Sequence, residues 1–463
     1  MAQLSSLTAR YHLSRFDQVV LLTLIGLALL TALFVWRGDR IGLQVVAVSP
    51  SPDATNVSAR SPIQVTFDQT VVASGSLLPL TFSPPLTGTA RWEEKTLTFW
   101  PARPLVAQTT YIVTLDDQLK SQQGRPLRGL QQWQFQTRRP SILYIAADDL
   151  AHDQLFVIDP VDKQIEQLTH EPFGISDYAL APDGNTIAFA ALREDQGSDL
   201  GRINVEGTAR SSLLACPEAI CNQVVWQPDG RRFVYERRNF LVPGGAPGPP
   251  RLWWFNIADN NTVVIFEDTQ EIGYGAGWSP DGQWLGYVSP STQGIQLYHI
   301  NDGRSLIIPS RMGGLPVWNP QGNDLLITDI QSTEAGFAVH LLRVFPETGQ
   351  LEDISEGQSP IEDGAPVWSP DGAWIALTRK EAGAATGKQL WRMRADGSQA
   401  QALTSAPEIH HGLPAWSPDG QYLVYQRFVL KELGTSPSIW LIDLTTIEAQ
   451  ELVKAGNRPV WLP

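Results

Sequence analysis

Trp368-Ser-Pro-Asp-Gly372 and its copies decide the fold of this chain. Full copies are Trp278-Ser-Pro-Asp-Gly282 and Trp416-Ser-Pro-Asp-Gly420, and variants are Trp226-Gln-Pro-Asp-Gly230, Trp318-Asn-Pro-Gln-Gly322 and Leu180-Ala-Pro-Asp-Gly184. A further tryptophan, Trp461, stands where the next copy would begin. From Leu180 to Trp461 the copies are 46, 52, 40, 50, 48 and 45 residues apart. A period of roughly 40–50 residues with several short strands per repeat is typical of a β-propeller.

The pentapeptide has the chemistry of a tight turn between two strands. Proline fixes φ near −65°, and the glycine adopts the positive φ that the turn needs. A short apolar stretch, Pro366-Val-Trp368, precedes the turn, and the alternating stretch Trp374-Ile-Ala-Leu-Thr378 follows it. Each repeat therefore begins with a hairpin, and we expect its large, rigid tryptophan to pack between neighbouring blades.

The repeats predict a seven-bladed ring, with the strands of each blade named A to D from the innermost outwards. B strands are expected near 142–146, 186–190, 232–236, 284–288, 324–328, 374–378 and 422–426. The first of them has no A strand before it, and the last A strand, Pro459-Val-Trp461, has no B strand after it. We therefore expect the C-terminal strand to complete blade 1, since a closed ring leaves only short sheet edges. An open or six-bladed array is the alternative.

These residues resemble the TolB-like propeller repeat, an apolar strand followed by Trp-Ser-Pro-Asp-Gly and a β-branched strand. The resemblance covers residues 139–463. It implies a protein-docking module of the bacterial envelope, although propellers host many unrelated activities. The propeller domains of prolyl-oligopeptidase-like enzymes carry similar repeats, but there a hydrolase domain that follows the propeller performs catalysis.

Residues 18–36 predict a membrane segment. They contain no charged side chain, and nineteen helical residues span roughly 28 Å, close to the thickness of a bilayer core. The run is longer than the core of a usual signal peptide. We expect an uncleaved signal anchor with residues 1–17 as a short cytoplasmic tail, and a cleaved signal peptide is the alternative.

Residues 41–138 predict a small β-sandwich, so that the chain after the helix is all-β. Strands are expected at 43–48, 63–67, 96–100, 111–115 and 132–136, a spacing that fits an Ig-like fold. The segments Pro62-Ile-Gln-Val-Thr-Phe67 and Trp133-Gln-Phe-Gln-Thr137 resemble a bacterial Ig-like domain. Such domains act as spacers or adhesive modules, and this one is expected to lift the propeller off the membrane.

The net charge indicates which partners do not suit this protein, and the cysteine content predicts how its two thiols are used. Residues 1–138 carry a net charge of +4, so residues 139–463 carry −18 of the total of −14, which argues against a nucleic-acid partner. Cys216 and Cys221 are the two cysteines. In an exported domain they predict a local disulfide, with a free thiol pair or a metal site as the alternatives.

Signatures of enzymes are missing from the sequence. It has no Gly-x-Ser-x-Gly elbow, His-Glu-x-x-His motif or P-loop. His410 and His411 are the one conspicuous titratable pair, but adjacent residues of an extended segment point to opposite sides. No metal or cofactor is therefore expected.

Loop lengths separate the two faces of the predicted ring. The B–C connections are long and dissimilar (237–250, 379–388 and 428–438), whereas the A–B turns are uniformly tight. We call the side with the B–C and D–A connections the loop face and the opposite side the turn face. Varied loops on a rigid scaffold are where binding usually occurs. Candidate ligand-binding residues in the D–A segments are Asp177, Gln223, Tyr274, Arg311, Glu362, Asp363, His410, His411, Asn457 and Arg458.

The sequence therefore predicts a single-pass membrane protein, with both β domains outside the cytoplasm, that binds or scaffolds a protein, peptide or envelope polymer. The alternative is a hydrolase or lyase that uses carboxylates of the loop face, namely Asp177, Glu362 and Asp363.

Overall fold

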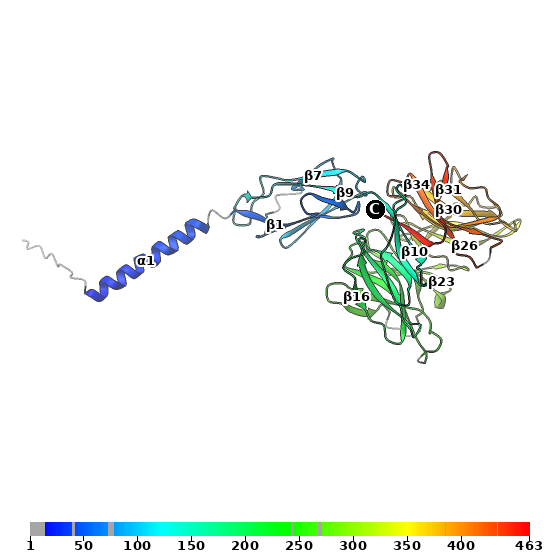
Figure 1. Cartoon of the computed structure of the whole chain (residues 1–463), viewed down its shortest axis with the longest axis horizontal. Helices are drawn as coiled ribbons and strands as arrows, with labels where there is room; N and C mark the ends of the chain where they lie inside the picture. Colours follow the sequence, from blue (N-terminus) through cyan, green and yellow to red (C-terminus); the bar gives the residue numbers. More distant parts are fainter. Residues whose placement is uncertain are drawn as a thin grey trace, which may run out of the picture. The chain divides into compact units, whose positions relative to one another are not determined.

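The computed structural model describes residues 14–38, 42–72, 78–242, 244–266, 271–384, 386–432 and 434–463, so most of the expected cytoplasmic tail (1–17) lies outside the described residues. The chain divides into two compact units (Figure 1). The first comprises the residues up to Asp53, together with Ile63–Trp100 and Tyr111–Phe135. The second comprises Ala54–Pro62, Pro101–Thr110 and Gln136–Pro463.

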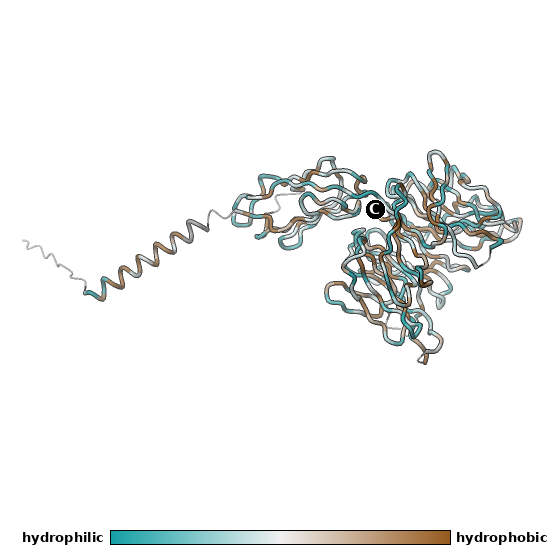
Figure 2. Tube along the Cα trace, in the orientation of Figure 1, coloured by the Kyte–Doolittle hydropathy of each residue, from teal (hydrophilic) through white to brown (hydrophobic). Residues whose placement is uncertain are grey.

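One helix, α1 (Arg15–Gly38), precedes the β-structure. Ser14 caps it reciprocally, because the Ser14 hydroxyl accepts the Asp17 amide at 3.2 Å while the Asp17 carboxylate accepts the Ser14 amide at 3.0 Å. The hydroxyls of Thr23 and Thr31 donate to carbonyls one turn back, so neither is left without a partner in an apolar medium. Apolar residues follow one another along the helix (Figure 2), and by length and composition Arg15–Leu33 could cross a membrane.

The Ig-like region pairs its strands into two sheets. One has the order β5-β6-β3-β1-β8: Gly88–Glu93, Thr96–Pro101, Ile63–Phe67, Leu43–Ser49 and Leu127–Arg128. The other has the order β2-β9-β7-β4: Ala54–Val57, Gln132–Thr137, Thr110–Leu115 and Leu80–Ser83. In β3 and β9 alternate side chains are buried. This is expected because successive side chains of a strand point to opposite faces of the sheet. All five expected strands are present, and the short β2, β4, β5 and β8 were not predicted.

After residue 138 the strands come in antiparallel groups of four. The first is β37-β10-β11-β12: Asn457–Leu462, Ser141–Ala147, Asp153–Ile158 and Ile165–Gln167. The next are β13–β16 (Ile175–Leu180, Thr186–Leu192, Ser198–Asn204, Ser211–Leu214) and β17–β20 (Ala219–Trp226, Arg232–Asn239, Arg251–Asn256, Asn261–Val264). Then follow β21–β24 (Tyr274–Trp278, Trp284–Ser289, Gly294–His299, Ser305–Pro309), with the single-turn 3-10 helix η1 (Pro290–Thr292) between β22 and β23. The last are β25–β28 (Val317–Trp318, Leu325–Thr333, Gly336–Phe345, Gln350–Asp353), β29–β32 (Ile361–Trp368, Trp374–Glu381, Gln389–Arg394, Gln401–Ala402) and β33–β36 (Ile409–Trp416, Tyr422–Val429, Ser438–Asp443, Ala449–Val453).

The turn motif uses each of its polar positions. In the copy at 368–372, the Ser369 hydroxyl donates to the Asp371 carboxylate at 2.6 Å and accepts the Trp374 amide at 2.9 Å. The same carboxylate accepts the Ala373 amide at 3.1 Å, and Gly372 has φ 68°. These bonds close the hairpin between β29 and β30 and explain why Ser, Asp and Gly recur together.

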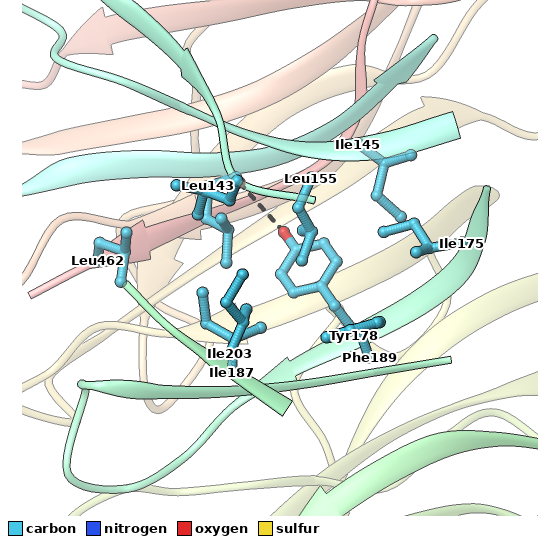
Figure 3. Packing of buried hydrophobic residues seen from close by; sticks show 10 residues of the cluster. Leu143, Ile145, Leu155, Ile175, Tyr178, Ile187, Phe189, Ile203 and Leu462 are labelled. Carbon is cyan, nitrogen blue, oxygen red and sulfur yellow. Dashed lines mark hydrogen bonds between the residues drawn. The ribbon is translucent and has the colours of Figure 1, made fainter. Parts of the chain in front are cut away.

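Most of the motif tryptophans connect their group of strands to the group before it. Their indole N–H groups donate to inner-strand carbonyls: Trp318 to Gly277 (3.0 Å), Trp368 to Val317 (3.1 Å), Trp416 to Val367 (3.2 Å) and Trp461 to Ala415 (3.2 Å). Apolar clusters fill the spaces between neighbouring groups. In one of them, Tyr178 points its hydroxyl at the Leu143 carbonyl, and Leu462 of the C-terminal strand packs beside them (Figure 3).

Candidate functional site

The candidate binding residues lie mainly in the inner strands, and the prediction that they sit in D–A connections was wrong for all but Arg311. Asp177 lies in β13, Gln223 in β17, Tyr274 in β21, Glu362 and Asp363 in β29, His410 and His411 in β33, and Asn457 and Arg458 in β37. The inner strands begin earlier than their apolar runs because a bulge interrupts the alternation. Gln223 and Arg458 occupy such irregular positions, with φ 52° and 54°.

The structure brings three candidates together around one buried carboxylate. Asp177 is 3% exposed, and its Oδ1 lies 2.5 Å from the Arg458 guanidinium. Its Oδ2 accepts the Gln223 amide at 2.6 Å. Burial raises the pKa of Asp177, against the opposing effects of Arg458 and the amide of Gln223. Through these bonds the Asp177 carboxylate, which lies in β13, links β17 and the C-terminal strand to β13.

Glu236 repeats this arrangement one blade further on, and the sequence reading did not select it. Its carboxylate accepts the amide of Gly275, another inner-strand residue with positive φ, at 2.8 Å. Burial raises the pKa of Glu236, and the nearby Asp177 adds a small effect of the same sign. Each carboxylate accepts the backbone N–H of an irregular inner-strand residue in the following blade. We therefore infer that both carboxylates hold neighbouring blades together.

A second group of candidates surrounds Asp363, which is 1% exposed. Both of its oxygens accept from the Arg379 guanidinium, at 2.6 and 2.9 Å, and the Ser355 hydroxyl donates at 2.5 Å. Its neighbour Glu362 points the other way and pairs with Lys380 at 3.1 Å. The carboxylate of Asp363 is thus fully engaged inside the protein, whereas that of Glu362 remains partly open to solvent.

Lys388 links the histidines to this group, and the sequence reading did not select it. Its ammonium donates to the Asp363 carbonyl at 3.2 Å, while its backbone lies against His410 and His411. Burial lowers the pKa of Lys388, opposed by Glu362 and Asp363. Burial and the two lysines Lys388 and Lys380 lower the pKa of His410. The signal for Lys388 was its place at the end of a long B–C loop.

We expect His411 to make the stability of the protein depend on pH. It is 2% exposed, and burial lowers its pKa from 6.5 to about 4. Between these values the unfolded chain binds a proton that the folded chain does not, so stability is full above pH 6.5 and falls as the pH drops towards 4. Replacing His411 by Gln should therefore reduce the loss of melting temperature between pH 7 and pH 4.5.

The exposed His170, replaced by Gln, is the matched control and should leave that difference unchanged. Thermal melts of the full-length chain at both pH values measure the effect. If the parent and His411→Gln lose the same number of degrees, His411 is not responsible for any acid sensitivity.

The remaining candidates do not join either group. Arg311 is exposed, and its backbone amide donates to the Asp329 carboxylate at 2.8 Å. Tyr274 and Asn457 are half-buried at the beginnings of their strands. No set of three or more His, Cys, Asp or Glu side chains that could hold a metal ion occurs within the described ranges.

Four inner strands line a pocket of about 350 Å³ that is mostly apolar. Its wall is formed by Tyr178, Ala365, Pro366, Val367, Leu413, Pro414, Ala415, Arg458, Pro459 and Val460. Proline lacks an N–H group and is tolerated at bulges and edge strands. The prolines therefore protect the inner strands from pairing with one another.

The loop face carries large apolar side chains that point into solvent. Leu150 and Leu241, in two different B–C loops, are 75% and 74% exposed, and Phe337, at the beginning of β27, is 73% exposed. Phe173 and Met312 in D–A connections are each nearly half exposed. The long β26–β27 hairpin presents Phe337 at its tip. Sequence reasoning had selected polar residues of this face, but exposed apolar side chains on otherwise polar loops are the stronger signal of an interface.

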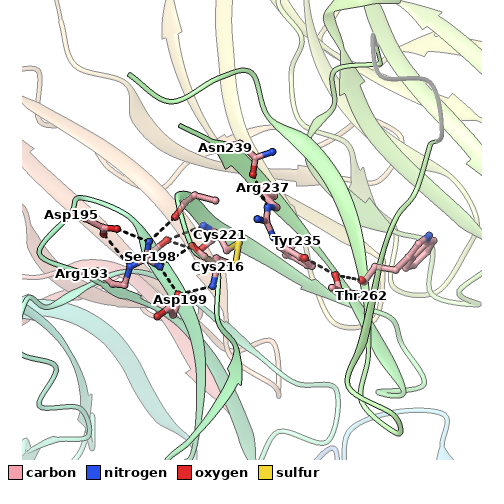
Figure 4. The surroundings of a disulfide bond; sticks show 12 residues. Arg193, Asp195, Ser198, Asp199, Cys216, Cys221, Tyr235, Arg237, Asn239 and Thr262 are labelled. Atoms are coloured by element: carbon pink, nitrogen blue, oxygen red, sulfur yellow. Dashed lines mark hydrogen bonds and ion pairs between the residues drawn. A yellow bond between two sulfur atoms is a disulfide. The ribbon is translucent and has the colours of Figure 1, made fainter. Parts of the chain in front are cut away.

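Cys216 and Cys221 are joined by a disulfide, with their Cα atoms 6.3 Å apart (Figure 4). Cys216 lies in the connection before β17, whereas Cys221 lies in β17 itself. The Arg193 guanidinium donates to the Cys216 carbonyl at 3.0 Å and pairs with Asp199 at 2.5 Å. Both cysteines are buried.

Comparisons with known proteins agree with these two β regions. Residues 39–137 match the family "Bacterial Ig-like domain", and residues 252–456 match the family "TolB beta propeller domain". The Tol-Pal system protein TolB of Anaeromyxobacter dehalogenans is 34% identical over 96 residues, or 20% of this chain and 19% of that protein. An uncharacterised protein of Agrobacterium fabrum is 26% identical over 196 residues, or 39% and 57%.

The chain thus spans between about a fifth and just over half of the length of these relatives. Among solved structures, a prolyl endopeptidase superposes with a TM-score of 0.51 at 13% identity, covering 75% of this chain and 49% of the endopeptidase. That likeness shows the fold alone. The chain carries a bacterial Ig-like domain followed by a TolB-like β-propeller.

Proposed function

We propose that this protein is an extracytoplasmic binding or scaffolding protein whose propeller docks a protein, peptide or envelope polymer through its loop face. The observation that carries the proposal is the set of solvent-exposed apolar side chains on separate B–C connections and hairpin tips, above all Leu150, Leu241 and Phe337. Protein interfaces use such anchors within a polar rim. The TolB-like repeat supports the same class of function.

The proposal includes a seven-bladed ring closed by the C-terminal strand. Two observations support it. The strand β37 pairs antiparallel with β10, with Trp461 opposite Ile142. Trp461 also donates to the Ala415 carbonyl, as Trp318, Trp368 and Trp416 do to the strands before them.

The proposal places residues 41–138 (the Ig-like domain) and 139–463 (the propeller) outside the cytoplasm, and residues 18–36 in the cell membrane as a single-pass anchor. The exposed, apolar helix α1 supports the membrane anchor. The disulfide supports a location outside the cytoplasm, because disulfides persist in oxidising compartments. Mass spectrometry of the mature protein tests the anchor, because an N-terminus beyond Trp36 would mean a cleaved signal peptide.

The enzyme alternative receives less support from the same residues. A catalytic carboxylate needs an oxygen that can reach a substrate. Asp177 is buried in bonds to Arg458 and to backbone amides. Asp363 is buried in bonds to Arg379 and to the Ser355 hydroxyl, and Glu362 pairs with Lys380. We therefore propose that the protein is not an enzyme and needs no cofactor, and that these carboxylates fix the inner strands.

Replacing Leu150 and Phe337 together by Asp should weaken the docking of the partner by roughly 100-fold or more, because each buried apolar anchor contributes about 1.5–3 kcal/mol. The melting temperature should hardly change, since both side chains are in water in the free protein. Quantitative capture from envelope extract on the immobilised full-length chain, followed by titration of the captured partner, measures the effect.

Val161→Asp is the matched control, because Val161 is 68% exposed but lies in a C–D turn on the turn face. A partner captured equally by the parent and the loop-face variant, but lost from Val161→Asp, would mean that the functional face has been assigned to the wrong side.

A further inference from the structure

A second pocket, of about 470 Å³, lies on the turn face, opposite to the proposed docking surface. One wall consists of the turn prolines of five successive repeats, Pro182, Pro228, Pro280, Pro320 and Pro370. The other wall consists of Ala59–Arg60 and Pro101–Pro104. All of these residues belong to the same compact unit.

Hydrogen bonds hold the second wall beside the first repeat. The side-chain amide of Asn185 donates to the Ser61 hydroxyl at 3.3 Å, and the backbone amide of Leu105 donates to the Ala59 carbonyl at 2.8 Å. Arg138, which is 8% exposed, donates its backbone amide to the Val57 carbonyl at 2.8 Å and its guanidinium to the carbonyls of Gly184 and Pro463. The pocket is therefore bordered by segments that are fixed to each other.

Arg60 and Arg103 bring two positive charges to this pocket. Within the described ranges no carboxylate forms an ion pair with Arg60, and no hydrogen bond to its guanidinium is present. Both arginine side chains are exposed to solvent at the pocket. The positive charge of Arg103 is one of the influences that lower the pKa of Asp371, a nearby carboxylate of the turn motif. Two guanidinium groups on the lining of one pocket would both attract an anion that enters it.

The rest of the lining suits an anion with an apolar or planar body. Trp278 and Trp318 join the prolines in the wall. The Trp278 indole N–H is buried and, within the described part of the chain, has no acceptor, although Trp318 uses its own to bind the preceding strand. The volume falls in the range of small-molecule sites, roughly 300–1,000 Å³, which is more space than a bare inorganic ion requires.

We propose that this turn-face pocket binds a small organic anion whose carboxylate or phosphate group is held by Arg60 and Arg103. Planar guanidinium groups bind both kinds of oxyanion through paired N–H donors. The proline and tryptophan walls contact the body of the ligand. This site lies away from the loop face, so anion binding can be measured without a docking partner.

The test is calorimetric titration of the full-length chain in non-ionic detergent with citrate and with pyrophosphate, at constant ionic strength maintained with chloride. We expect saturable binding of at least one of the two anions to the parent. Citrate alone indicates a carboxylate ligand, pyrophosphate alone indicates a phosphate ligand, and both indicate a shared oxyanion site. Binding of neither anion overturns the proposal.

Two variants assign the binding to the pocket. Arg60→Gln combined with Arg103→Gln should weaken it roughly 10- to 100-fold, as expected for the loss of charge-assisted hydrogen bonds. Arg103→Gln alone alters only an exposed side chain and keeps the test valid if the double variant does not fold. The control Arg202→Gln removes an exposed arginine that bonds Ser211 in another part of the same unit, and it should bind as the parent does. Unchanged affinity in the folded pocket variants overturns the proposal.

Discussion

Deleting residues 457–463 should abolish the cooperative thermal unfolding of the propeller or lower its midpoint steeply, and aggregation should increase. These residues form strand β37, which pairs with β10 and places Trp461 and Leu462 in two different apolar clusters. Loss of one buried aromatic residue alone costs about 3–5 kcal/mol, and the whole domain is stabilised by about 5–15 kcal/mol. The deletion also exposes the edge of β10, which favours aggregation.

Val460→Asn is the control within the same strand. Val460 lies between Pro459 and Trp461 but is 38% exposed in the pocket lined by the inner strands, so the melt of this variant should match the parent closely. Tryptophan fluorescence and light scattering during heating of the full-length chain report both effects. A deletion variant that melts like the parent would refute the proposal that the C-terminal strand closes the ring.

Asp363→Asn should lower the free energy of unfolding by roughly 3–5 kcal/mol, the cost of breaking a buried ion pair by removing one partner. The asparagine keeps the shape of the side chain but leaves Arg379, which is 6% exposed, without a counter-charge. It also removes the ionised acceptor of the Ser355 hydroxyl. From its sequence position alone, Asp363 was expected to contact a ligand. Its burial makes it a determinant of stability.

The adjacent Glu362 provides the comparison. Its pair with Lys380 is partly exposed on both sides, and such pairs contribute about 0–1 kcal/mol. Glu362→Gln should therefore melt within a degree or two of the parent. Chemical denaturation of both variants measures the difference, and equal stabilities would show that the Asp363–Arg379 pair adds nothing to the fold.

The sequence by itself determined the local structure and its repetition. Trp-Ser-Pro-Asp-Gly predicts a hairpin because proline, the hydroxyl, the carboxylate and glycine each satisfy one requirement of the same five-residue turn, and the structure shows those bonds at Ser369 and Asp371. The alternation of apolar residues likewise predicted β3 and β9 of the Ig-like domain. These features depend on neighbours within a few positions, so composition and spacing are sufficient to find them.

The tertiary structure alone decided what the candidate residues do. Because of bulges, the inner strands begin several residues before their apolar runs. Residues such as Asp177 and His411 are therefore buried in strands rather than exposed in loops. Arg458 meets Asp177 across 281 positions of the sequence, and Lys388 meets His411 across 23. Burial and such long-range pairing arise only when separate repeats pack together, and no local pattern of residue types encodes which carboxylate finds an arginine.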